Sequence, residues 1–143
     1  MIKFGITKAA VLIAGLSAVL ALALPASPSQ AHVRRVDNRT VRIGSCRSSG
    51  DFAICTASGS TNHPLYVRVH VEASPNQHIS GAWDMTCSKG TGAGGTQGTI
   101  SGTTPRAKRL RMPFANPDSC VVAADAQLSG SGSIHVYLTA RVP

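Results

Sequence analysis

Two stretches of this sequence alternate polar and aromatic side chains in a way that suits ligand binding. The first has Tyr66, Arg68, His70 and Glu72 at every second position, and the second has His135, Tyr137, Thr139 and Arg141. Alternate residues of a β-strand point to the same side, so each stretch predicts one outward face. Tyr and Arg often anchor binding surfaces. If the two strands are neighbours, Tyr66, Arg68, His70, His135, Tyr137 and Arg141 form one patch; the alternative is a scattered, solvated surface.

A dense basic run between positions 106 and 111 is the second candidate for binding. Its cations are Arg106, Lys108, Arg109 and Arg111. Together with Arg34, Arg35, Arg39 and Arg42 they are suited to an anionic polymer. The alternative is that charges on an exposed edge strand prevent unwanted pairing. The chain has 14 Lys and Arg against 6 Asp and Glu, which favours anionic partners such as wall polymers, membrane surfaces or acidic proteins. No nucleic-acid motif is present.

A metal site becomes available if the chain is cut after Ala31. His32 is then the first residue, and its free amine and imidazole are suited to chelating one copper ion. In that single feature the chain resembles secreted copper-binding sandwich proteins that begin with His, including the copper-dependent polysaccharide oxygenases. The alternative is a terminal histidine that binds nothing specific. We expect no other cofactor.

Motifs for catalysis are scarce in this sequence. It contains neither the G-x-S-x-G nor the H-E-x-x-H pattern. A small hydrolase remains an alternative, because a catalytic triad can be assembled from distant residues. The glycine-rich segment 90–95 matches G-x-G-x-x-G, but no helical pattern follows it, which favours a hairpin loop. The sequence therefore favours a binding protein over an enzyme.

The first 31 residues have the pattern of a secretory signal peptide. Lys3 and Lys8 precede an apolar run from Ala9 to Leu24, and small residues precede position 32. The run is short for a membrane span, which needs about 20 residues. We expect residues 32–143 to form a single exported domain, with 32–39 as a flexible basic arm. The alternative is an uncleaved anchor.

The exported part shows the two-residue periodicity of strands and no helical pattern. Alternation covers residues 51–58, 65–72, 79–87, 108–114, 120–128 and 134–142, and weaker strands are expected near 40–43 and 99–104. Residues 88–98 are rich in Gly and Thr, and we expect them to form a loop. Seven or eight short strands predict an all-β, two-sheet antiparallel sandwich of immunoglobulin-like architecture, with a small β-barrel as the alternative.

Four cysteines in an exported chain predict two disulfides. Three pairings are possible. We favour Cys46–Cys55, because a turn sequence lies between the two residues, and we expect them to meet across a hairpin. Cys87–Cys120 follows by elimination. The spacing contains no C-x2-C pair, which argues against zinc.

Three segments resemble small exported proteins of actinomycetes that have no assigned function. They are 46–55 (CRSSGDFAIC), 81–85 (GAWDM) and 116–120 (NPDSC). The resemblance covers most of the exported part and implies no activity. Actinomycetes also export protease inhibitors of similar length with two disulfides, but no reactive loop is recognisable here. Our leading hypothesis is a secreted, non-enzymatic binding module whose partner is an anionic wall polymer or a protein, with a protease inhibitor among the alternatives.

Overall fold

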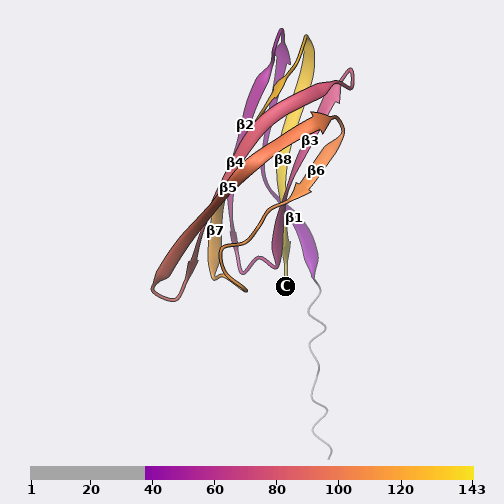
Figure 1. Ribbon diagram of the computed structural model, residues 1–143. Coiled ribbons are helices and arrows are strands. Elements are labelled where there is room, and N and C mark those ends of the chain that lie inside the picture. Colours follow the sequence, from indigo (N-terminus) through magenta and orange to yellow (C-terminus); the bar gives the residue numbers. More distant parts are fainter. Residues whose placement is uncertain (1–37) are drawn as a thin grey trace, which may run out of the picture. The chain divides into compact units, whose positions relative to one another are not determined.

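The computed structural model of the protein describes residues 38–143, so the leader, His32 and most of the predicted arm lie outside the described residues. Eight strands follow one another (Figure 1): β1 (Arg39–Gly50), β2 (Ile54–Asn62), β3 (Tyr66–Ser74), β4 (His78–Lys89), β5 (Gly92–Thr103), β6 (Arg106–Arg109), β7 (Ser119–Leu128) and β8 (Gly132–Val142). Residues 38–143 contain no helix, and hence none long and apolar enough to cross a membrane.

The strands form two antiparallel sheets of four strands each. The first sheet has the order β1–β8–β3–β6, and the second has the order β2–β7–β4–β5. Figure 1 shows them as two layers. Within residues 38–143 no strand is paired with strands of both sheets. The predicted sandwich is therefore confirmed, and the alternative small barrel is excluded.

The core lies between the sheets and follows the predicted alternation. Val67, Val69 and Val71 of β3 are completely buried. The inward residues of three further strands are also buried: Ile79, Trp83, Met85, Cys87, Cys120, Val122, Ala124, Ala126, Leu128, Ile134, Val136, Leu138 and Ala140. Burying a large aliphatic side chain contributes about 1.5–3 kcal/mol. This burial also fixes the outward faces, because a slip of one residue would expose the whole inward set.

Four local predictions differ from the structure. The first strand, expected near 40–43, extends over Arg39–Gly50 as β1 and includes Arg39 of the predicted arm. Residues 92–98, expected in a loop, belong to β5, whose pairing with β4 runs from Gly92 opposite Lys89 to Thr103 opposite His78. The continuous ladder compensates for the low strand propensity of glycine. In place of the strand expected over 108–114, the structure has the shorter strand β6, Arg106–Arg109. Pro113 lacks the N–H group that a longer ladder would require. Leu65, expected to face inward on this strand, precedes β3 and is 38% exposed.

Both predicted disulfides are present. Cys87 and Cys120 are directly opposite each other on β4 and β7. Cys46 and Cys55 are also joined, but they connect the two sheets and not the strands of one hairpin. The reason is the turn after Gly50, which takes the chain from the first sheet to the second. Phe52 has a φ of 55° in this turn.

Candidate functional site

The outward residues of β3 and β8 lie side by side, because these strands are neighbours in the first sheet. The register pairs Tyr66 with Arg141, Arg68 with Thr139, His70 with Tyr137 and Glu72 with His135. The two alternating stretches therefore form one continuous surface. We call it the arginine–tyrosine face; its members are Arg42, Arg47, Tyr66, Arg68, His70, Glu72, Arg109, His135, Tyr137, Thr139 and Arg141.

The edge strand β1 contributes Arg42 and Arg47 to the face. These residues are five positions apart and would point to opposite sides of a regular strand. A bulge between Arg42 and Gly44 shifts the register, so that Arg42 lies beside Thr139 and Arg47 beside His135. Sequence reasoning placed Arg42 only in an N-terminal basic group and missed Arg47. The bulge breaks the period of two, and no other signal in the sequence marks Arg47.

Two guanidinium groups lie over the ring of Tyr66. The Cζ atom of Arg109 is 4.7 Å from the ring centroid, and that of Arg68 is 5.1 Å from it. Both distances lie within the roughly 6 Å range of cation–π attraction. Arg68 and Arg109 are also cross-strand partners, an arrangement of like charges that is unfavourable in itself. Tyr66 thus helps to hold two exposed cations close together.

The second tyrosine of the face, Tyr137, is packed against three neighbours. Its ring stacks on that of His70, with the centroids 4.6 Å apart and the planes 1° apart. The ring of His135 lies at 4.8 Å with a tilt of 32°, and the Cζ atom of Arg42 lies 4.6 Å from the centroid. Protein groups therefore cover much of both tyrosine rings. Arg42, Arg68 and Arg109 are exposed, so their N–H groups are available to a ligand.

Glu72 is the only acidic member of the arginine–tyrosine face. Its Oε1 accepts a hydrogen bond of 3.0 Å from the hydroxyl of Tyr137, and its Oε2 lies 3.5 Å from Nδ1 of His135. Burial raises the pKa of Tyr137 above its ordinary value of 10.0, and the hydrogen bond to Glu72 and its negative charge add to the effect. Tyr137 is therefore a neutral hydrogen-bond donor at neutral pH.

The pKa of His70 is lowered, which favours the neutral form of its ring. Burial lowers its pKa below the ordinary value of 6.5, and the positive charges of Arg68 and Arg42 lower it further, while Glu72 offsets part of the shift. Its Nε2 lies 2.9 Å from Oγ1 of Thr139, within hydrogen-bond distance. An anion bound beside His70 would favour the charged ring and raise its pKa.

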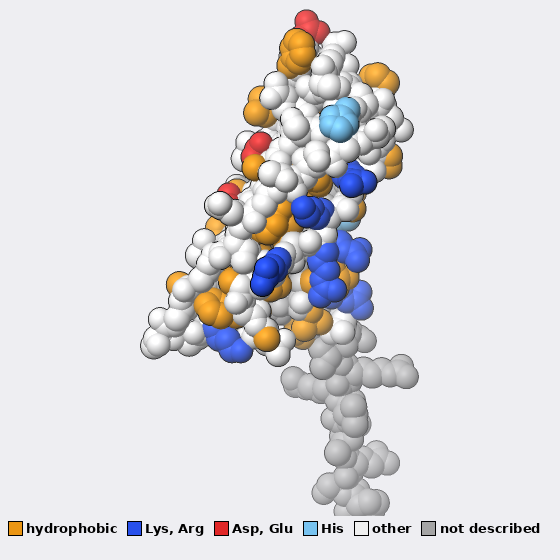
Figure 2. Space-filling model, viewed as in Figure 1, with side chains coloured by type: hydrophobic (Ala, Val, Ile, Leu, Met, Phe, Trp, Pro, Cys, Tyr) orange, Lys and Arg blue, Asp and Glu red, His pale blue; other side chains and the backbone are white. Residues whose placement is uncertain are grey.

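The four cations of the predicted basic run do not form one patch. Arg109 joins the arginine–tyrosine face, whereas Arg106 and Lys108 pair with the inward positions of β3 and lie next to β5. Lys108 Nζ donates a 2.6 Å hydrogen bond to the carbonyl oxygen of Thr99. Arg111 follows the strand and lines a hollow beside Trp83. Figure 2 shows Lys and Arg side chains over β6 and the neighbouring end of the domain, with acidic side chains along the opposite border.

The chemistry available to the face is the binding of oxyanions. It carries five arginines and one carboxylate, which gives a net charge of 5 − 1 = +4 with His neutral. A guanidinium presents paired N–H donors that match carboxylate and phosphate groups. Because the arginines are spread over four strands, the face can contact several oxyanions at once.

The predicted copper ligand His32 lies outside the described residues, so that hypothesis stays a prediction. Within residues 38–143, no group of three His, Cys, Asp or Glu side chains comes together in a way that could hold a metal ion.

Comparison with known proteins adds no family to this description. No protein-family model matches the chain, and a search of curated proteins finds no significant match.

Proposed function

We propose that the protein is an exported binding module that holds an anionic polymer, such as a carboxylate- or phosphate-bearing wall polymer, on the arginine–tyrosine face. The leader pattern of residues 1–31 supports export. The two disulfides also support it, because such bonds persist in oxidising compartments.

The observation that carries the proposal is the pairing of Arg68 and Arg109 over the ring of Tyr66. Two like charges in register repel each other, and the one carboxylate of the face, that of Glu72, contacts Tyr137 and His135 and forms an ion pair with neither arginine. A bound oxyanion removes this repulsion and accepts hydrogen bonds from both groups. Packing against Tyr66 restricts the two side chains beforehand, which reduces the entropy lost on binding.

A polymer suits this surface better than a folded acidic protein does. The centres of protein interfaces are more apolar than the rest of the surface and are enriched in aromatic residues and arginine. The arginine–tyrosine face has the arginines and tyrosines, but no large aliphatic side chain is among its members. Three of the four large exposed hydrophobic residues, Phe52, Ile54 and Val121, belong to the β1–β2 turn and to strands β2 and β7, away from the face. The fourth, Leu65, directly precedes β3 at one end of the face.

The test is to measure binding to polygalacturonate and to poly(glycerol phosphate), with neutral dextran as a control. The double variant Arg68→Gln with Arg109→Gln removes two charges from the face. The matched variant Arg106→Gln with Lys108→Gln removes two charges from the same region but outside the face. Each lost charge-assisted contact costs about 1.5–3 kcal/mol, so the first variant should bind at least tenfold more weakly.

The matched variant should change affinity by less than about threefold, because its cations act only through screened, longer-range attraction. Equal losses in both double variants would contradict a site on the arginine–tyrosine face, because binding would then depend equally on cations outside it. Failure of the wild-type protein to bind either anionic polymer more tightly than dextran would refute the proposal.

A further inference from the structure

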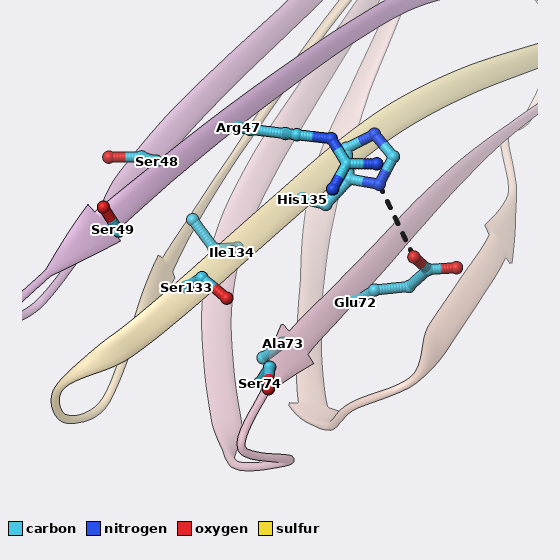
Figure 3. Close-up of a pocket in the computed structure, with 9 residues that line it drawn as sticks. All are labelled: Arg47, Ser48, Ser49, Glu72, Ala73, Ser74, Ser133, Ile134 and His135. Carbon is cyan, nitrogen blue, oxygen red and sulfur yellow. Dashed lines mark ion pairs between the residues drawn. The ribbon is translucent and has the colours of Figure 1, made fainter.

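The arginine–tyrosine face ends in a recess where long side chains give way to short ones. Arg47, His135 and Glu72 form one row across β1, β8 and β3, and Ser49, Ser133 and Ser74 form the next outward row. The step between the rows leaves a hollow of about 390 Å³. This volume lies within the range of about 300–1,000 Å³ that is typical of small-molecule sites. Figure 3 shows the Arg47 and Glu72 side chains extending toward His135.

His135 sets this recess apart from the open part of the face. Its side chain is 8% exposed, and neither ring nitrogen has a hydrogen-bond partner. Glu72 Oε2 is near Nδ1 at 3.5 Å, but the geometry does not make a hydrogen bond. Buried polar groups are nearly always satisfied by a protein group, a water or a ligand. His135 lines the recess, but its two ring nitrogens are themselves covered, so a ligand seated there can become their missing partner once a neighbouring side chain moves aside.

The lining offers a specific combination of hydrogen-bonding groups. Arg47 supplies a cation, Glu72 supplies an acceptor, and the serine row supplies hydroxyls that both donate and accept. Ala73 and Ile134 also border the recess, but their side chains pack on the core side of the sheet. A free oxyanion would use Arg47 but would leave the serine hydroxyls and the Glu72 acceptor unmatched. A neutral sugar would leave the charge of Arg47 unmatched.

We propose that this recess binds one sugar unit that carries an oxyanion, either a carboxylate or a phosphate. The oxyanion lies against Arg47 and His135, and the sugar hydroxyls bond to Glu72 and the serine row. The inference rests on the proposed function, because it assigns the recess to one unit of the polymer that the arginine–tyrosine face holds.

The test is calorimetric titration of the protein with galacturonic acid and with galactose 6-phosphate. Galactose, acetate and inorganic phosphate serve as partial ligands. One or both acidic sugars should bind at least tenfold more tightly than every partial ligand, because charge-assisted and neutral hydrogen bonds then act together. The preferred acidic sugar identifies the oxyanion. Equal affinity for acetate or inorganic phosphate would overturn the sugar assignment, and so would equal affinity for galactose.

Two substitutions locate the binding. Ser133→Leu fills the exposed floor of the recess and should reduce acidic-sugar affinity at least tenfold, whereas Ser101→Leu, at an exposed serine of β5 in the other sheet, should leave it unchanged. Arg47→Gln should lower the affinity about tenfold, and Arg111→Gln should not. Thermal unfolding of each variant shows whether it is folded. Acidic-sugar binding that survives both Ser133→Leu and Arg47→Gln would overturn the proposal.

Polymer binding by the same proteins separates this inference from the proposed function. If Ser133→Leu loses the acidic sugar but keeps most of its affinity for polygalacturonate, both proposals hold. If polymer binding depends on Arg68 and Arg109 while no acidic sugar binds the wild-type protein, only the recess assignment fails. If the acidic sugar binds and no anionic polymer does, only the proposed function fails.

Discussion

His70 on β3 and Tyr137 on β8 are directly opposite each other, and their rings stack with centroids 4.6 Å apart and planes 1° apart. This contact joins the two central strands of the arginine–tyrosine face on their solvent side, while buried valines join them on the core side. Arg42 and Glu72 hold the other parts of Tyr137. The central part of the face is therefore ordered before any ligand arrives, which lowers the cost of binding.

A double-mutant cycle measures this stacking. We expect His70→Ala and Tyr137→Ala to be coupled by about 0.5–1.5 kcal/mol in the free energy of unfolding, which is typical of aromatic pairs. The control cycle combines His70→Ala with Tyr66→Ala. These two residues lie four positions apart on the same strand, β3, and are not cross-strand partners. Its coupling should stay within about 0.5 kcal/mol. Equal coupling in both cycles, measured by urea unfolding, would contradict a specific stack.

The lowered pKa of His70 predicts how stability changes with pH. The unfolded chain gains a proton on this residue near pH 6.5, whereas the folded protein gains it only at lower pH. The contribution of His70 to stability is therefore present above pH 6.5 and is lost as the pH falls toward the folded-state pKa. Nuclear magnetic resonance titration of the ring gives the pKa, and urea unfolding gives the slope. A ring that titrates above pH 6.5 in the free protein would contradict this explanation.

The same residue should report ligand binding. A bound polyanion favours the protonated ring, so saturating polygalacturonate should raise the pKa of His70. By linkage, affinity should increase as the pH falls through the window between the two pKa values. The His70→Gln variant should lose this part of the pH dependence. An unchanged pKa in the complex would place the polymer away from the face.

Packing around Trp83 depends on a glycine in β5. A Cβ atom at Gly98 would lie 2.7 Å from Cζ2 of the Trp83 ring, which is buried and has little room to move. Gly98→Ala should therefore lower the free energy of unfolding by about 1–3 kcal/mol through overpacking. Gly95→Ala on the same strand is the control, because its nearest new contact is at 3.5 Å. Equal destabilisation by the two variants would show that strand propensity, and not Trp83, decides the effect.

The two disulfides should differ in their contribution to stability. The Cys87–Cys120 bond spans 33 positions and Cys46–Cys55 spans 9. Loop-closure entropy predicts losses of about 4 and 3 kcal/mol when each pair is replaced by alanine. Urea unfolding of the two double variants measures both losses. A larger loss for Cys46–Cys55 would show that its connection between the sheets matters more than loop length.

Local periodicity was sufficient to predict the strands that form the core. Alternation in 65–72, 79–87, 120–128 and 134–142 corresponds to β3, β4, β7 and β8, because burial on one side imposes a period of two. The first half of β5, residues 92–98, carried no such signal, since its inward positions include Gly94 and Gly98, and a glycine without a side chain shows no alternation. Only the second half was expected, as a weak strand near 99–104. Residues 92–98 are held in the sheet by their pairing with β4.

The candidate site was only partly predictable for a different reason. The sequence identified the outward residues of β3 and β8 but not the order of the strands, because adjacency depends on contacts between distant segments. Arg47 and the serines of the recess required the bulge in β1 and the pairing of three strands. The cations of the basic run lie on different sides because neighbouring residues of a strand alternate: Arg109 is paired with the outward Arg68, and Lys108 is paired with the inward Val69.

The most direct test of the account is to follow the arginine side-chain Nε–Hε signals while the protein is titrated with polygalacturonate. We expect the signals of Arg42, Arg68 and Arg109 to shift together and to saturate at one affinity, while those of Arg106 and Arg111 stay nearly unchanged. Shifts confined to Arg106 and Arg111, or small unsaturable shifts of every arginine, would contradict a binding site on the arginine–tyrosine face.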